Sequence, residues 1–285
     1  MSESLSKVKK RIQTVESTKK ITSAMNMVSS VKFRSLQREY DNRATYFECL
    51  EDLVSTVFNA AKGEFVDSIY INENAKSSKT LYVVVTSNLG LCGAYNDNVL
   101  KYIRNAYKDG DEIVTIGSAI YKEMKNKRSD TPHYDDFVNI MDGLSMSKAR
   151  DLSSFLVTKF LSEKYNKVVL LYTRYINAIS FQVTPLSLLP VQIKKDNSAR
   201  YNPGQFEPDL SSFIDKVIRK YLTSTLYIKL FESSLCEQAS RRNAMDNADK
   251  NAKELIEKLN LQYNKARQSS ITQEIIEVVS ASLNK

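Results

Sequence analysis

Residues 210–270 read LSSFIDKVIRKYLTSTLYIKLFESSLCEQASRRNAMDNADKNAKELIEKLNLQYNKARQSS, a stretch that contains neither glycine nor proline. Steps of seven residues from Leu210 and from Ile214 reach mostly apolar side chains, and the polar ones gather at Gln238, Arg242 and Asp249. Two such rows are typical of a helix that pairs with another helix in a coiled coil. The first row is Leu210, Val217, Ser224, Phe231, Gln238, Met245, Ala252, Leu259 and Ala266; the second is Ile214, Tyr221, Ile228, Leu235, Arg242, Asp249, Ile256, Tyr263 and Ser270.

Helix-breaking residues are missing from both ends of the chain. All seven glycines and all five prolines lie between Gly63 and Pro208. Glycine costs a helix interior about 1 kcal/mol and proline about 3 kcal/mol, so each end predicts one long helix. We therefore expect three parts: an N-terminal coiled-coil helix over residues 1–62, an α/β domain with a loop over 63–208, and a C-terminal coiled-coil helix over 209–285.

The N-terminal helix has a less regular apolar pattern. Its apolar residues follow a 3-4 spacing that stops near Lys19 and Lys20 and then resumes: Leu5, Val8, Ile12 and Val15, followed by Ile21, Met25 and Val28. This predicts a coiled-coil seam with a shift of register. Because the middle segment can return the chain, the expected partner is the C-terminal helix, antiparallel. The alternative is an ordinary amphipathic helix that packs on a domain.

The middle segment alternates short apolar runs with helical patterns. Such alternation predicts a small α/β domain with a mostly parallel sheet. The expected strands are 81–85, 112–116 and 167–175, with 179–183 pairing to the last, and the expected helices are 95–107, 118–127 and 147–164. The stretch 196–208 is rich in turn-forming residues and predicts a loop that leads into the C-terminal helix.

The residues that usually carry chemistry are few. Three widely spaced cysteines and one histidine, His133 in an expected loop, give no zinc or disulfide pattern and no catalytic triad. Gly90-Leu91-Cys92-Gly93 follows an expected strand, but it lacks the spacing of a phosphate-binding loop and predicts a tight turn into a helix. No apolar run approaches the roughly 20 residues of a membrane span. The sequence therefore predicts no catalytic site, no cofactor, no metal and no insertion into lipid.

Positive charge is concentrated at the N-terminus. The net charge is +8, and residues 1–40 hold nine Lys and Arg against three Glu. A basic helix favours an anionic partner, which by composition alone could be nucleic acid, acidic lipid or an acidic protein surface. Aromatic residues do not alternate with this cluster, and no nucleic-acid-binding motif is present. A basic coiled-coil protein that binds nucleic acid, or a structural tether, remains a weaker alternative.

Several short sequence motifs lie near both ends of the chain and after the first expected strand. They are KRI at 10–12, TKKITSAMNMV at 18–28, GLCG at 90–93, EQA at 237–239, YNKARQ at 263–268 and ITQE at 271–274. Together they resemble the gamma subunit of F-type ATP synthases, over nearly the whole chain. Three departures stand out, because the family usually has Lys at Ser23, Asp-Arg at Asn88-Leu89 and Gly-Ala at Ala281-Ser282. A gamma-like shaft of a divergent rotary ATPase is therefore kept as an alternative.

The resemblance implies the central rotor shaft of the F1 head. The paired helices would turn inside a ring of three alpha and three beta subunits and couple proton flow to ATP synthesis or hydrolysis on beta. The middle domain would form a foot against the epsilon subunit and the membrane c-ring. The protein would then be a peripheral membrane protein on the cytoplasmic face of a bacterial cell membrane.

The resemblance also implies contact residues. Met25, Arg267, Gln268, Thr272 and Glu274 match family positions that face the beta ring. Glu207, in the loop before the C-terminal helix, matches the region expected to contact the c-ring. From the residues alone, all six could equally be surface or packing residues of a coiled coil and its loop.

Overall fold

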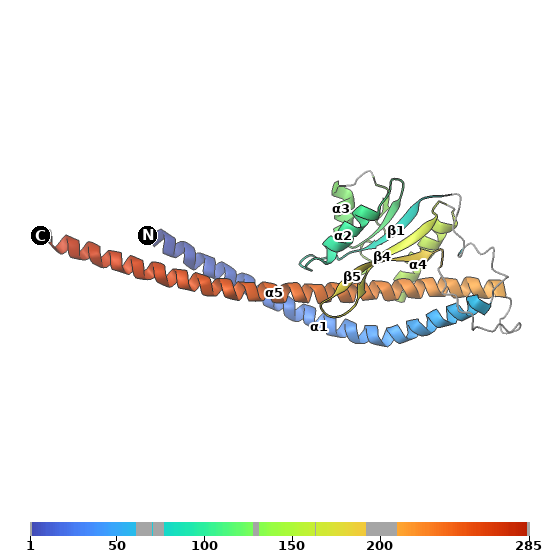
Figure 1. The fold of residues 1–285 in the computed structure, drawn as a ribbon, viewed down its shortest axis with the longest axis horizontal. Helices are drawn as coiled ribbons and strands as arrows, with labels where there is room; N and C mark the ends of the chain where they lie inside the picture. Colours follow the sequence, from blue (N-terminus) through green and yellow to red (C-terminus); the bar gives the residue numbers. More distant parts are fainter. Residues whose placement is uncertain are drawn as a thin grey trace. The chain divides into compact units, whose positions relative to one another are not determined.

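The two predicted long helices dominate the secondary structure. The computed structural model describes residues 2–60, 70, 77–127, 131–162, 164–191 and 210–283. Helix α1 (Ser2–Ala60) has 59 residues and helix α5 (Leu210–Leu283) has 74 (Figure 1). The predicted domain limits, at 62/63 and at 208/209, lie outside the described residues. Spatial proximity divides the chain into two compact units, residues 32–240 and residues 1–31 together with 241–285.

The larger unit, residues 32–240, contains one five-stranded sheet. Its strands are β1 (Thr80–Val85), β2 (Glu112–Ile116), β3 (His133–Tyr134), β4 (Lys167–Tyr175) and β5 (Phe181–Leu189). The spatial order is β3-β2-β1-β4-β5, with β4 and β5 antiparallel and every other pair parallel. The predicted α/β fold with a mostly parallel sheet is therefore confirmed.

Both ends of this sheet differ from the sequence prediction. His133 belongs to the short strand β3 and not to a loop, because it pairs with Ile113 at the sheet edge. The last strand continues past Val183 to Leu189 and includes Pro185. Proline lacks a backbone N–H and reads as a strand breaker, but β5 is an edge strand, where a missing donor is tolerated.

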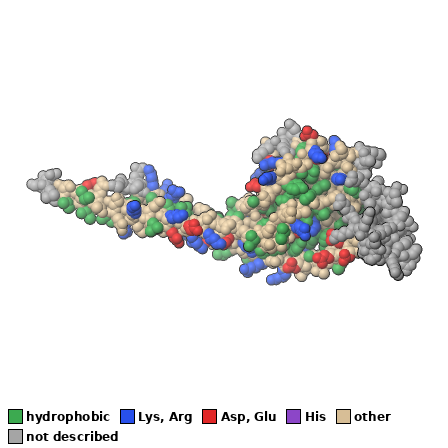
Figure 2. Space-filling model, viewed as in Figure 1, with side chains coloured by type: hydrophobic (Ala, Val, Ile, Leu, Met, Phe, Trp, Pro, Cys, Tyr) green, Lys and Arg blue, Asp and Glu red, His purple; other side chains and the backbone are tan. Residues whose placement is uncertain are grey.

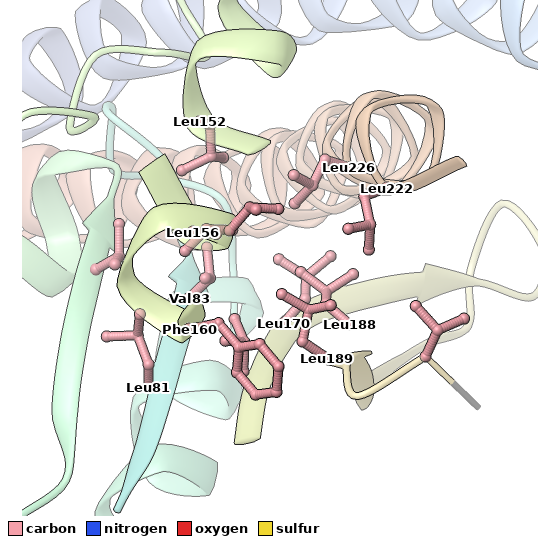
Figure 3. Packing of buried hydrophobic residues seen from close by; sticks show 14 of the residues in the cluster. Leu81, Val83, Leu152, Leu156, Phe160, Leu170, Leu188, Leu189, Leu222 and Leu226 are labelled. Atoms are coloured by element: carbon pink, nitrogen blue, oxygen red, sulfur yellow. The ribbon is translucent and has the colours of Figure 1, made fainter. Parts of the chain in front are cut away.

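The sheet is covered by helices on both faces. On one face, α2 (Tyr95–Ala106) and α3 (Ser118–Lys127) bury Val99, Ile103 and Ile120 against the strands. On the other, α4 (Met146–Leu161) and the first half of α5 pack on the sheet, as Figure 3 shows for Leu156 and Leu226. This second cluster also contains Leu50 and Val54 of α1. The larger unit thus has one apolar core on each side of the sheet.

Within the same unit, α1 packs antiparallel on α5. Phe33 clusters with Leu235 and Ala239, whereas Phe47 stacks on Tyr221 with ring centroids 6.4 Å apart. Residue numbers therefore rise along α1 where they fall along the facing part of α5. The antiparallel pairing expected from the sequence is confirmed here by direct contacts.

In the smaller unit, α5 shows the predicted heptad rows. From Lys250 to Ser270 every residue is exposed except six, and these six are the expected members of the two rows: Ala252, Ile256, Leu259, Tyr263, Ala266 and Ser270. Leu259 is only 3% exposed. Both chain ends lie at the same end of this unit, as antiparallel helices require (Figure 1).

The predicted register shift in α1 is wrong. The 3-4 spacing of covered positions continues without interruption through Lys19, Thr22, Asn26 and Ser29 to the buried Phe33. Ile21, which the pattern of apolar residues places in the seam, is 61% exposed. The seam therefore keeps its register and accepts polar side chains for three turns.

Candidate functional site

The C-terminal end of α5 carries an exposed apolar surface. All residues from Ile271 to Ser280 are exposed, and they include Ile271, Ile275, Ile276, Val278 and Val279, each 46–70% exposed. Ile271, Ile275 and Val278 recur at four and three residues, so they share one face of the helix. An exposed apolar surface of this kind typically marks a contact with another protein.

Four of the predicted contact residues lie in this end of α5 or in the turn before it. Arg267, Gln268, Thr272 and Glu274 are all exposed. Gln268 and Thr272 share a face, and the Thr272 hydroxyl donates a hydrogen bond to the backbone carbonyl of Gln268 at 2.9 Å. Arg267 and Glu274, seven residues apart, share a neighbouring face. This segment therefore offers a cation, an amide and a carboxylate next to apolar side chains.

The other two predicted contact residues lie elsewhere. Met25 is half-buried on α1, beside the seam position Asn26. Among the described residues, no hydrogen bond or ion pair joins Met25 to the four residues on α5. Glu207 lies outside the described residues.

Sequence reasoning missed a second exposed apolar stripe, which lies on α1. Ile21, Met27, Val28 and Val31 are 56–69% exposed. Ile21, Val28 and Val31 are spaced by seven and three residues and therefore lie on one face. The helical spacing of these apolar residues is visible in the sequence. Because the true seam positions beside them are polar, the apolar residues were assigned to the seam instead.

Charged side chains flank these apolar surfaces. Figure 2 shows Lys and Arg side chains at several points along the two long helices. On α1, Lys9, Lys10, Arg11 and Lys20 are exposed. On α5, Lys250 and Lys253 form ion pairs one turn back, with Asp246 and Asp249. The exposed cations of α1 thus remain accessible to an anionic partner in the chain as it stands.

The Gly90–Gly93 loop forms the predicted tight turn between β1 and α2. Leu91 and Gly93 have positive φ angles of 61° and 56°. Asn96 closes the turn, since its Oδ1 accepts from the backbone N–H of Ser87 at 3.0 Å and its Nδ2 donates to the Cys92 sulfur at 3.3 Å. Cys92 is 2% exposed. This arrangement is structural and offers no open nucleophile.

The departure at Asn88-Leu89 has a local structural basis. Asn88 donates to Asp142 Oδ1 at 3.0 Å and accepts from the backbone N–H of Ser118 at 3.1 Å, whereas Leu89 is 70% exposed. Asn88 thus ties the β1–α2 loop to its neighbours, and Leu89 faces solvent.

Two kinds of site find no support in the part of the chain that the structure describes. There, no group of three His, Cys, Asp or Glu side chains is placed to hold a metal ion. No described helix combines the length and the apolar character needed to cross a membrane.

Comparison with known proteins gives matches along the whole chain. A family model described as ATP synthase matches residues 4–282. The ATP synthase gamma chain of Mycoplasma capricolum subsp. capricolum is 35% identical over 283 residues, which cover 99% of each chain. The ATP synthase gamma chain of Clostridium pasteurianum is 33% identical over 284 residues, which cover 98% of each chain.

Solved structures give the same fold. A chain of the Euglena gracilis mitochondrial ATP synthase (OSCP/F1/c-ring) aligns with a TM-score of 0.68 at 18% identity and covers 99% of this chain and 94% of that chain. A chain of the Tetrahymena thermophila mitochondrial ATP synthase central stalk and c-ring aligns with a TM-score of 0.58 at 22% identity and covers 80% of this chain and 99% of that chain.

Proposed function

The chain belongs to the ATP synthase gamma chain family, and we propose that it is the central rotor shaft of an F1 complex. In this function the paired helices turn inside a ring of three alpha and three beta subunits. They couple proton flow through the membrane sector to ATP synthesis or hydrolysis on beta, while this chain carries no catalytic site. The observation that carries the proposal is the family match over residues 4–282, joined to the two long helices it spans.

The exposed end of α5 supports an insertion into such a ring. Ten consecutive residues, Ile271 to Ser280, are exposed in the isolated chain although five of them are large and apolar. Burial in a surrounding protein would remove this apolar surface from water, at roughly 25 cal/mol per Å². The exposed α1 stripe at Ile21–Val31 offers a second contact surface of the same chemistry.

We assign the contacts with beta to Met25, Arg267, Gln268, Thr272 and Glu274. The four α5 residues are exposed polar groups beside the apolar end, so they can exchange hydrogen bonds as the surrounding subunits change. A shaft that makes different contacts with each state of a beta subunit biases that subunit toward one state, which is mechanical coupling. The exposed cations of α1 add attraction to acidic partner surfaces, and salt would weaken it.

The opposite contacts are assigned to the foot. Glu207 is proposed to contact the c-ring, with the epsilon subunit on the α/β domain. The complex would then lie on the cytoplasmic face of a bacterial membrane, held there by other subunits and without insertion of this chain into lipid.

Co-expression of this chain with the alpha and beta subunits of its own complex tests the function. A stable, ATP-hydrolysing complex that contains all three chains is expected. Alpha and beta that assemble or hydrolyse ATP equally well without this chain would contradict the rotor function. Co-purification with nucleic acid in place of alpha and beta would favour the basic coiled-coil alternative. Proton pumping by the complete enzyme then distinguishes a standard ATP synthase from a divergent relative.

The assigned contacts are tested by Arg267→Ala combined with Gln268→Ala. Both side chains are exposed, so the chain should fold and assemble normally. Turnover or coupled proton pumping should fall at least about tenfold, which corresponds to about 1.4 kcal/mol of lost interaction. The matched control is Lys258→Ala with Gln262→Ala, a cation and an amide exposed on the same helix. Equal activity of the two double variants would remove Arg267 and Gln268 from the site.

A further inference from the structure

Strand β4 extends beyond the end of its neighbour β1. The β1–β4 pairing ends at Leu171, whereas β4 continues to Tyr175. On the far side, β5 pairs with β4 up to Tyr175. The backbone groups of the last β4 residues that are not used by β5 therefore need another partner, because buried backbone donors and acceptors are almost always paired.

Helix α5 provides these partners with a row of side chains. The N–H of Thr173 donates to Ser233 Oγ at 3.2 Å, and the Cys236 thiol donates to the Thr173 carbonyl at 3.4 Å. The N–H of Tyr175 donates to Glu232 Oε1 at 2.9 Å. Glu232, Ser233 and Cys236 are 0–2% exposed. In these contacts α5 takes the place that a longer β1 would occupy.

The row continues to the loop after β1. Ser240 Oγ donates to the Cys92 carbonyl at 2.7 Å. Residues 232, 233, 236 and 240 lie within about 100° of one another around the helix, so they form one continuous face. We call Glu232, Ser233, Cys236 and Ser240 the polar row of α5.

Glu232 has the most partners in this row. Lys229 Nζ lies 3.1 Å from its Oε2, which compensates the charge of the buried carboxylate. The Tyr40 hydroxyl of α1 lies near the same carboxylate; burial raises the pKa of Tyr40, and the neighbouring Glu232 charge raises that pKa further. The Glu232 carboxylate thus lies where the sheet and both long helices meet.

The polar row differs in kind from the apolar contacts around it. Leu222, Leu226 and Leu230 hold α5 on the sheet by burial, which is not directional. The interdigitated side chains already resist sliding and turning of the helix, and directional bonds add to that resistance. Hydrogen bonds have narrow limits of distance and angle, so a row of them fixes both the rotation and the translation of the helix.

We propose that the polar row of α5, with Glu232 as its main positioning residue, is the torque-bearing joint between the shaft helix and the α/β domain. This inference rests on the rotor function proposed above. Helix α5 continues from Ser240 to Leu283, so a tangential force on its far part tends to turn the helix against the sheet. If the foot includes the α/β domain, that load passes through the polar row.

The first test uses the isolated full-length chain and does not depend on the rotor function. Glu232→Ala removes the acceptor of the Tyr175 N–H, whereas Glu232→Gln keeps a neutral acceptor. Hydrogen exchange at the Tyr175 amide should accelerate at least about tenfold in Glu232→Ala, as expected for the loss of a hydrogen bond to a charged group, and less in Glu232→Gln, whereas the Thr173 amide keeps its Ser233 acceptor. Glu254→Ala, an exposed carboxylate on the same helix, should leave both amides unchanged.

The second test measures stiffness in the assembled complex. A probe is attached to the α/β domain through Lys108→Cys, after the exposed Cys49 is replaced by serine; Cys92 and Cys236 are buried. With the head fixed to a surface, Glu232→Ala should widen the angular fluctuations of the paused probe relative to wild type and Glu254→Ala. Glu232→Gln should restore part of the stiffness. Unloaded ATP hydrolysis should stay unchanged, whereas ATP-driven proton pumping should fall.

The outcomes are distinguishable. Unchanged amide exchange in Glu232→Ala would overturn the joint and leave the rotor function untouched. Faster exchange with unchanged stiffness would show that Glu232 only stabilises the fold, which also overturns the joint. Failure of the wild-type chain to assemble with alpha and beta would instead remove the rotor function. If Glu232→Ala does not fold, Ser233→Ala takes its place in both tests, because it removes the acceptor of the Thr173 N–H.

Discussion

At the scale of single residues, Gly117 shows how one backbone position holds the end of the parallel strands together. Its φ is +90°, and a Cβ there would lie 2.1 Å from the Thr86 carbonyl oxygen. Gly117→Ala should therefore destabilise the chain by about 2 kcal/mol or more, since both strain and a backbone clash are introduced. Gly90→Ala is the matched control, because nothing lies within 4 Å of its Cβ position. Urea unfolding followed by circular dichroism measures both, and equal midpoints would contradict the argument.

A second residue-scale prediction concerns Glu112 at the start of β2. Burial alone would raise the pKa of Glu112, but hydrogen bonds from Lys164, Tyr165 and Tyr134 outweigh burial and hold that pKa below the usual 4.5. A lowered pKa in the folded state stabilises the fold above pH 4.5, and this stabilisation is lost as the pH falls through 4.5 and then through the folded-state pKa. Thermal unfolding of Glu112→Gln should therefore depend less on pH below 4.5 than that of wild type. If the unfolding temperatures of the two proteins changed in parallel with pH, this role of Glu112 would be refuted.

At the scale of elements, the heptad rows of α5 make a prediction with a control on the same helix. Leu259 is 3% exposed in the seam, and Leu261 is 72% exposed two residues later. Leu259→Ala should destabilise the paired helices by about 2–5 kcal/mol, because a buried leucine leaves a cavity. Leu261→Ala should change stability by no more than about 0.5 kcal/mol. Hydrogen exchange along residues 245–270 reports on the pairing directly, and similar protection in the two variants would argue against this seam.

The elements also show where sequence reasoning succeeds and where it fails. The α5 rows were predictable because apolar residues hold most seam positions, and the strands of the parallel sheet because they are short apolar runs. The α1 register was not predictable from apolar residues alone, since Thr22, Asn26 and Ser29 occupy the seam while Ile21 and Val28 are exposed. The sequence prediction ended this strand before Pro185, because proline is tolerated only in an edge strand and only the order of strands in the sheet shows that β5 is one.

The candidate site was predictable only in part, again for a physical reason. The exposure of Arg267, Gln268, Thr272 and Glu274 follows from their positions between the heptad rows. Their proposed function depends on a partner surface, which a pattern within one chain does not contain. The polar row around Glu232 could not be predicted for a similar reason, because the partners of Glu232, Ser233 and Cys236 are backbone groups of β4 about 60 residues earlier in the chain.

At the scale of the whole molecule, the proposed function and the stability of the isolated chain place different requirements on the end of α5. Ile271, Ile275 and Val278 share a face and are 46–70% exposed, so the isolated chain gains little from them. In the triple variant Ile271→Gln, Ile275→Gln and Val278→Gln, the free energy of unfolding in urea should therefore stay within about 0.5 kcal/mol of the wild-type value. The variant should also be more soluble.

In the assembled enzyme the same three changes should have a large effect. Under the proposed function this end of α5 is buried among other subunits, where an unpaired glutamine amide would cost about 1–3 kcal/mol. Assembly with alpha and beta, or ATP-driven rotation of the assembled complex, should therefore fall at least about tenfold. The control is Leu261→Gln, an equally exposed apolar residue farther from the end. Normal assembly and rotation of the triple variant would mean that this surface is not inserted among other subunits, and would point instead to the α1 stripe around Val28 as the main contact with the ring.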